Sequence, residues 1–219
     1  RIHPSKVELR TAVTLAREAG FQIAVHAIEA EAVDAAVEAL AGGPDALPPH
    51  GRDRIEHCSE SPPSSLKKLS ASGLMVVTQP GFIYHNGHRY ISEVSTDVLP
   101  WLYRVGSFQE GGLGPAFASD APVIEPDPLL GIYAAVTRRA ASGDTLNAGE
   151  KVTALEALRM YTLNGAYAAF QEGDKGTIQA GKLADLVLLD ADPTAVEPER
   201  IRDIRPVLTM IGGRVVWEA

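Results

Sequence analysis

The sequence lacks several features that would identify its class at once. It has one cysteine, Cys58, in 219 residues, which excludes an intramolecular disulfide framework and a cysteine-rich zinc site. No apolar run reaches membrane-spanning length and no secretory leader is visible. The chain begins RIHPSK without an initiator methionine, so we expect the true N-terminus, with any targeting segment, upstream. The reducing cytoplasm is the predicted location.

Positive charge is also scarce. The 20 lysines and arginines stand against 28 aspartates and glutamates, which gives a formal charge of −8. No run of basic residues is present that would neutralise phosphates or bind an anionic membrane, so neither nucleic acid nor membrane is an expected partner. With 45% hydrophobic residues, the chain has enough apolar material for one large α/β domain or for a domain with an appendage.

Helical and strand-like segments alternate along most of the chain. Ser5 and Glu8 have the spacing of a capping box, and they open a helix that stops at Gly20. A second helix is predicted to stop at Gly42-Gly43. Strands are predicted at FQIAVH (21–26), DRIEHC (53–58), LMVVTQP (74–80) and GPAFASD (114–120), and further helices at 61–73, 95–106, 127–141 and 150–170. This alternation predicts parallel β/α units.

The pattern changes after Gly173. Residues 175–193 and 207–219 are strand-like and are interrupted by glycine pairs and an Asp-Pro step. We therefore predict a barrel-like α/β domain over 1–172 and a small β domain over 173–219.

Three of the four predicted strands end in a side chain that binds metals, namely His26, His57 and Asp120. In a parallel barrel the carboxyl ends of all strands lie on one rim, so residues far apart in sequence meet there. Two imidazoles and a carboxylate suit zinc, and three protein ligands leave one coordination position open for water. A bound ion lowers the pKa of that water to about 7 and polarises the carbonyl that the water attacks.

Each of these residues also has an ordinary explanation. A lone histidine after a strand is more often a core or loop residue than a ligand, and Asp120 is equally suited to a turn or a helix cap. No short-range signature such as HExxH is present. The residues alone therefore leave a catalytic metal site and an ordinary α/β domain both open.

Four further residues are candidates for contact with a substrate: Glu29, Gln79, His85 and His88. The Asn86-Gly87 step predicts a turn, so His85 and His88 are expected in a loop above the rim, facing substrate or solvent. Glu29 lies three residues past His26 and could reach the cavity or simply favour the start of a helix. Two other residues receive no catalytic role: Cys58 is expected to be a buried structural thiol, and Lys182 belongs to the β domain.

Six segments resemble, in order and spacing, the C-terminal part of the metal-dependent amidohydrolase superfamily, closest to its YtcJ-like, or amidohydrolase-3, group. They are FQIAVHAIE, RIEHCS, VTQPGF, FASDAPVIEPDPLLGIYAAVTRR, ALEALRMYTLNGAYAAF and KGTIQAGKLADLVLLDADP. The resemblance implies an α/β fold comprising strands 5–8 of a (β/α)8 TIM barrel, followed by part of a β-sandwich that Gly176–Val187 enters. It also implies that His26, His57 and Asp120 bind a divalent metal, most simply zinc, and that Asp120 takes the proton from the attacking water. The implied activity is hydrolysis of a carbon–nitrogen bond other than a peptide bond in a small amide or cyclic amide.

The resemblance also implies missing parts. The family's His-x-His pair and the ligand on its fourth strand have no counterpart here, HAIEA stands where His-Ala-Ile-Gly-Asp is common, and Ala121 stands where a tryptophan often follows Ser-Asp. We therefore expect the N-terminal half of the barrel to be supplied in cis or by a partner chain, and the 219-residue chain alone to be nearly inactive. A second copy of the chain, in a homo-oligomer, is a further candidate partner. The alternative function is a non-catalytic fragment or interaction module that retains the half-barrel.

Overall fold

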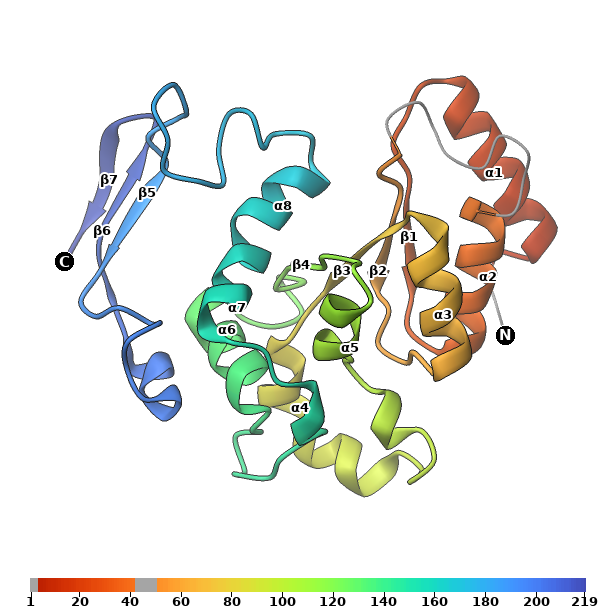
Figure 1. Ribbon diagram of the computed structural model, residues 1–219, viewed down its shortest axis with the longest axis horizontal. Helices are drawn as coiled ribbons and strands as arrows, with labels where there is room; N and C mark the ends of the chain where they lie inside the picture. The colour runs from red at the N-terminus through yellow and green to blue at the C-terminus, as the bar shows by residue number, and fades with distance from the viewer. Residues whose placement is uncertain (1–3, 42–50) are drawn as a thin grey trace. The chain divides into compact units, whose positions relative to one another are not determined.

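The computed structural model describes residues 4–41 and 51–219, so the predicted helix stop at Gly42-Gly43 lies outside the described residues. The contacts divide the chain into two units. One contains residues 1–78 and 93–116, and the other contains residues 79–92 and 117–219. Figure 1 labels the elements along the chain, and we describe the two units separately.

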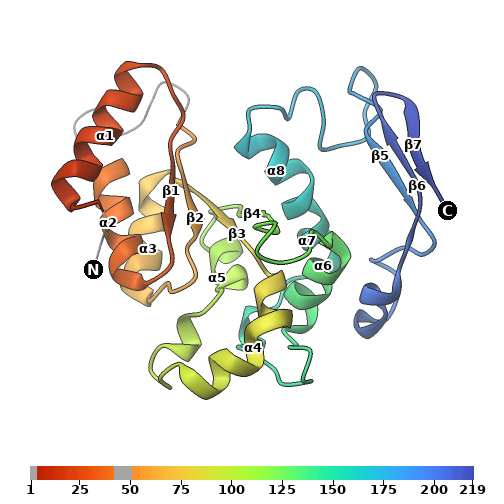
Figure 2. The ribbon, with the colours of Figure 1, turned by 180° about the vertical axis from the view of Figure 1, so that it is seen from behind.

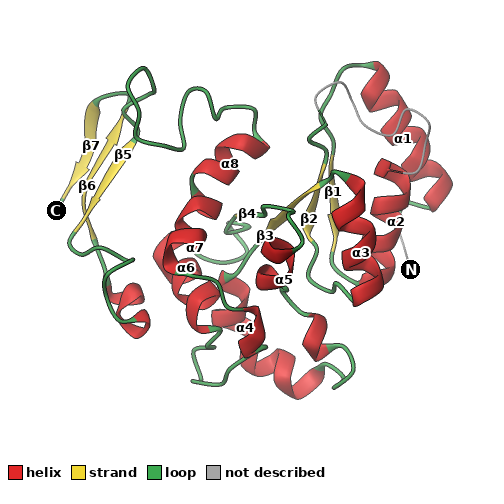
Figure 3. Cartoon of the chain, viewed as in Figure 1, coloured by secondary structure: helices red, strands yellow, loops and turns green. Residues whose placement is uncertain are grey.

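The first unit is built on parallel β/α units, as predicted. Its elements are α1 (Lys6–Glu18), β1 (Ala24–Ala27), α2 (Ala30–Ala41), β2 (Arg54–His57), α3 (Pro63–Ser72), β3 (Met75–Thr78), the 3-10 helix η1 (Leu99–Trp101) and α5 (Val105–Glu110). β1 pairs with β2 and β2 pairs with β3, both in parallel. β4 (Ala116–Phe117) completes the sheet order β1-β2-β3-β4. The alternation of helices and strands is visible in Figure 3.

The helices α1, α2 and α3 lie on one face of the sheet. Figure 2 shows this arrangement from the side opposite to that of Figure 1. Alternate strand residues face them, because side chains along a strand point to opposite faces. Ile55 and Val76 are register partners, and both are completely buried in a core that includes Leu40 and Leu69. Burying each of these side chains contributes about 1.5–3 kcal/mol. The core therefore fixes which face of β1 and β2 is left for other contacts.

α1 begins as the sequence predicts, because Ser5 and Glu8 form the complete capping box. The helix predicted over 95–106 is wrong as a continuous element, since η1 and the short α5 replace it. Both contain few residues, and Pro100 in η1 removes a backbone donor that a regular helix would need.

The second unit contains helices and a small antiparallel sheet. Its elements are α4 (Gly81–Glu93), α6 (Pro128–Thr137), η2 (Ala148–Glu150), α7 (Ala154–Tyr161), α8 (Leu163–Ala168), β5 (Leu186–Leu189), η3 (Pro198–Asp203), β6 (Pro206–Ile211) and β7 (Arg214–Glu218). β5, β6 and β7 form one sheet in that order, with antiparallel pairing throughout. A second sheet that would make a sandwich is not among the described residues. The predicted strand over 175–193 is confirmed only at β5.

Two predictions in this unit are wrong. The Asn86-Gly87 step is not a turn but lies inside α4. Gly87 serves close packing there, since a Cβ atom at this position would lie 2.9 Å from the Cβ of Ala140. The single helix predicted over 150–170 breaks at Thr162, whose φ of −114° and ψ of −85° are not helical and separate α7 from α8.

No helix in the described part of the chain is both long enough and apolar enough to cross a membrane.

Candidate metal centre

His26 and His57 lie side by side near the carboxyl ends of β1 and β2. The parallel register pairs His26 with Glu56 and Ala27 with His57. The two imidazole centroids are 4.5 Å apart with an interplanar angle of 73°. His57 is 7% exposed, whereas His26 is exposed. Two adjacent imidazoles are a donor pair that zinc and related divalent metals accept.

The backbone at the end of β2 explains how the two rings meet. In a regular strand, residue 57 would share the helix-covered face of Ile55. His57 and Cys58 instead have φ values of +70° and +51°, a left-handed conformation that costs roughly 1–2 kcal/mol per non-glycine residue. The chain therefore leaves the strand geometry at His57, and the imidazole lies beside that of His26.

Cys58, the residue after this turn, is a buried structural thiol, as predicted. Its side chain is 0% exposed, and Sγ lies 3.3 Å from Oγ of Ser61. Burial raises the pKa of the Cys58 thiol to about 12, and the contact with Ser61 offsets only part of this rise. A thiol of this kind is not a nucleophile near neutral pH. The Cys58 N–H donates to the carbonyl of Ala27 at 2.9 Å, which joins the turn to β1.

Asp120 lies in the second unit, three residues beyond β4. Its φ is +62°, its carbonyl accepts the N–H of Val123 at 2.9 Å, and it is half-buried. It thus occupies a turn, and the structure brings only His26 and His57 of the three predicted ligands together within one unit. Within residues 4–41 and 51–219, no group of three or more histidine, cysteine, aspartate or glutamate side chains forms a metal site. The complete three-ligand site stays a prediction.

Glu29 lies beside His26 in the first unit. Both residues border a groove of about 560 Å³ between α1, β1 and α2, whose other lining residues are mostly apolar. Glu29 is exposed, and its carbonyl accepts the N–H of Val33 in the first turn of α2 at 2.9 Å.

The other candidates for substrate contact lie in the second unit. Gln79 is 2% exposed. His85 lies in α4 with its ring 5.4 Å from that of Tyr84, and its Nε2 atom is buried without a hydrogen-bond partner among the described residues. His88 is on an exposed position of α4. A buried imidazole nitrogen without a hydrogen-bond partner lowers stability. Of the two histidines, His85 is therefore the better candidate for contact with a substrate.

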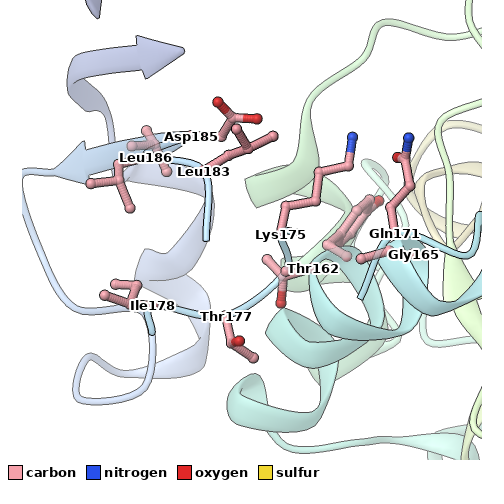
Figure 4. A pocket seen from close by; sticks show the side chains of 13 residues that line it. Thr162, Gly165, Gln171, Lys175, Thr177, Ile178, Leu183, Asp185 and Leu186 are labelled. Atoms are coloured by element: carbon pink, nitrogen blue, oxygen red, sulfur yellow. The ribbon is translucent and has the colours of Figure 1, made fainter. Parts of the chain in front are cut away.

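A separate cavity of about 470 Å³ lies in the second unit next to α8 and β5 (Figure 4). Thr162, Lys175, Asp185 and Leu186 are among its lining residues. None of the residues predicted from the sequence to bind metal or substrate lines it. This cavity is therefore not the predicted site.

Lys182 has a structural role that the sequence did not suggest. Its ammonium group donates to the carbonyl of Glu172 and to the hydroxyl of Thr177, both at 2.6 Å. It also donates to the carbonyl of Lys175 at 3.4 Å. The lysine thereby holds together the loop that follows α8. A lysine that directly follows a glycine, as Lys182 follows Gly181, carries no local signal for such contacts.

Comparison with known proteins supports the same family for the whole chain. The model of the amidohydrolase family matches residues 1–217. A Bacillus subtilis (strain 168) protein named as an amidohydrolase, YtcJ, is 30% identical over 207 residues, which are 93% of this chain and 39% of that protein. The N-substituted formamide deformylase of Arthrobacter pascens is 28% identical over 215 residues, 98% of this chain and 40% of the enzyme.

Solved structures agree with these sequence relationships. An uncharacterized metal-dependent hydrolase from Pyrococcus horikoshii OT3 superimposes with a TM-score of 0.77 at 27% identity, covering 91% of this chain and 40% of the other. The chain thus spans about two fifths of the length of the relatives it matches. Because the family match extends over nearly all of its residues, the chain belongs to the amidohydrolase family.

Proposed function

We propose that this chain is part of a metal-dependent hydrolase that cleaves a carbon–nitrogen bond other than a peptide bond in a small amide or cyclic amide. The observation that carries the proposal is the pair of imidazoles of His26 and His57, whose centroids are 4.5 Å apart at the carboxyl ends of adjacent parallel strands. Active sites of parallel barrels lie at this end of the strands. The deformylase among the relatives is named for an N-substituted formamide, which is a small amide.

In the proposed site, His26 and His57 would hold a divalent ion, for which zinc is our choice, and Asp120 would be the third ligand. When bound, such an ion lowers the pKa of its water and polarises the substrate carbonyl. Asp120 would accept the proton of the attacking water and return it to the leaving nitrogen. Glu29, Gln79, His85 and His88 are proposed to contact the substrate.

The proposed architecture is the second half of a (β/α)8 barrel with part of a β-sandwich. It would require the N-terminal half of the barrel, in cis or from a partner chain. Two features support an additional partner for the described residues. β1 pairs only with β2 among the described strands, and the strands β5 and β7 have exposed side chains at nearly every position. Unpaired edges and exposed apolar strands favour association.

The test uses the protein at its natural length, with turnover measured on a panel of small N-acyl and cyclic amides and with metal content determined in parallel. Chelation is expected to remove most of the activity, and zinc is expected to restore it. Asp120→Asn should retain much of the metal yet lose activity by about 10²-fold or more, since proton transfer contributes about 10²–10⁴-fold. His57→Ala should lose metal and activity together.

A matched control is Asp144→Asn. This substitution changes an exposed loop aspartate whose carboxylate accepts a hydrogen bond from the hydroxyl of Ser142. It should retain both metal and activity. Turnover that resists chelation, or full activity in Asp120→Asn, would contradict the mechanism. A natural-length protein with neither metal nor turnover would instead favour a non-catalytic module.

A further inference from the structure

We infer that Glu60 is a positioning residue that sets the distance between His26 and His57, an inference that rests on the proposed function. Glu60 lies three residues after His57 in the loop between β2 and α3. It contacts the loop that follows His26, so one residue joins the two histidine-bearing segments.

The first contact is between backbones. The Glu60 N–H donates to the carbonyl of Ile28 at 2.9 Å, two residues beyond His26. The Cys58 N–H donates to the carbonyl of Ala27 at 2.9 Å in the same way. The pairing of β1 with β2 therefore continues past the ends of both strands and past both histidines.

The second contact uses the Glu60 side chain. Its Oε2 atom accepts the N–H of Ala30 at 3.1 Å, and Ala30 is the first residue of α2. The residue before α2 is Glu29, which is not one of the side chains that usually cap a helix. A carboxylate at a helix N-terminus is stabilised by the unpaired N–H groups and by the helix dipole. Glu60 thus supplies from the neighbouring loop the cap that α2 does not have in its own sequence.

The far side of the Glu60 loop is also held. The Ser61 N–H donates to the carbonyl of Trp101 at 3.0 Å, and the Tyr103 N–H donates to the carbonyl of Ser59 at 2.8 Å. A guanidinium nitrogen of Arg104 donates to the carbonyl of Ser61 at 3.1 Å. Residues 101–104 thus hold the loop that contains Glu60 in place. The Glu60 carboxylate can therefore fix the position of the segment after His26.

This arrangement has a consequence for metal binding. Two ligands on separate strands bind one ion well only when their separation is held, and residues that orient ligands commonly change metal affinity by 10–100-fold when they are replaced. The left-handed turn at His57 and Cys58 costs energy, so the His57 segment needs contacts such as those of Glu60 to keep its conformation. Glu60 is assigned no contact with the substrate, and its proposed role is exerted through the two histidines.

The experiment compares Glu60→Ala, Glu60→Gln and Glu8→Ala in the protein at its natural length. Glu8→Ala is the matched control, because Glu8 also caps a helix of the same unit through the box with Ser5 but contacts neither histidine segment. The readouts are the dissociation constant for Zn²⁺, from competition with a chromogenic chelator, and the visible absorption spectrum of the Co²⁺-substituted protein. Urea unfolding in the presence of chelator measures the stability of each variant without metal.

Glu60→Ala is expected to weaken Zn²⁺ binding about tenfold and to change the Co²⁺ spectrum. Glu60→Gln keeps an oxygen that accepts the Ala30 N–H, so it should bind Zn²⁺ within about threefold of the wild type. Glu8→Ala should lose stability yet leave both metal readouts unchanged. If Glu60→Ala and Glu8→Ala destabilise the protein alike and Glu60→Ala binds Zn²⁺ as the wild type does, Glu60 is only a helix cap and the inference is overturned. If the wild-type protein binds no divalent metal, the proposed function fails and the role of Glu60 fails with it.

Discussion

The buried aspartate that precedes β2 offers a sharp test of how the first unit is held together. Asp53 is 0% exposed. Its Oδ1 atom accepts the N–H of Ile23 just before β1, and its Oδ2 atom accepts Nη2 of Arg17 from α1, both at 2.8 Å. Nη2 of Arg17 also donates to the carbonyl of Leu40 at the end of α2 at 2.7 Å. The Asp53 carboxylate therefore connects the starts of β1 and β2 with the end of α1, and Arg17 extends this connection to the end of α2.

Asp53→Asn removes the charge and leaves the shape nearly unchanged. The new side chain keeps one oxygen for the Ile23 N–H and turns its amide nitrogen, a donor, toward the donating Arg17. Breaking a buried ion pair by changing one partner costs about 3–5 kcal/mol. The side chain of Arg17 is 16% exposed, so water relieves part of this cost. We expect the free energy of unfolding to fall by about 2–4 kcal/mol.

The assay is equilibrium unfolding in urea, followed by circular dichroism, on the protein at its natural length. The control is Glu38→Gln, which removes an exposed ion pair between α1 and α2. Lys6 and Glu38 are 2.9 Å apart with side chains 48% and 44% exposed, and an exposed pair of this kind contributes about 0–1 kcal/mol. A loss below about 1 kcal/mol in Asp53→Asn, or an equal loss in both variants, would refute the reasoning.

Three further tests address other parts of the chain, two of them with substitutions. Lys182→Met removes the ammonium group that donates hydrogen bonds to three oxygens. It should lower the free energy of unfolding by roughly 1–3 kcal/mol, and limited proteolysis should cut the loop after α8 faster. Gly131→Ala places a Cβ atom 1.9 Å from the hydroxyl of Tyr161, so thermal unfolding should show a loss of about 1–3 kcal/mol, of which Tyr161→Phe should recover part. Because the pKa of Cys58 is raised to about 12, the native protein should not react with a thiol reagent at pH 8, whereas the unfolded protein should. Since the thiol ionises at lower pH when unfolded, its contribution to stability should be full at neutral pH and should fall as the pH rises above about 9; rapid labelling of the native thiol at pH 8, or stability that does not fall, would contradict its burial.

Local patterns were sufficient where the deciding interaction lies within a few residues. The capping box of Ser5 and Glu8 is such a case, because both partners belong to the first turn of α1. The order of helical and strand-like segments along the chain likewise predicted parallel β/α units, and β1, β2 and β3 do pair in parallel. His26 and His57 could be proposed as neighbours on the same grounds.

Local patterns failed where a distant contact changed the outcome. Asn86-Gly87 has the composition of a turn, yet both residues lie inside α4, where the missing side chain of Gly87 leaves room for Ala140. Glu60 looks like any surface glutamate in its own loop, and its role depends on the N–H of Ala30, thirty residues away.

By itself, the sequence determined the family, the β/α order and the candidate ligands, because each follows from residue types and spacings along the chain. Only the tertiary structure decided that the imidazoles of His26 and His57 lie 4.5 Å apart and that a left-handed turn brings them there. Backbone angles at a strand end, and bonds between loops that are distant in sequence, depend on the packing of the whole unit and leave no periodic signal in the residues that adopt them.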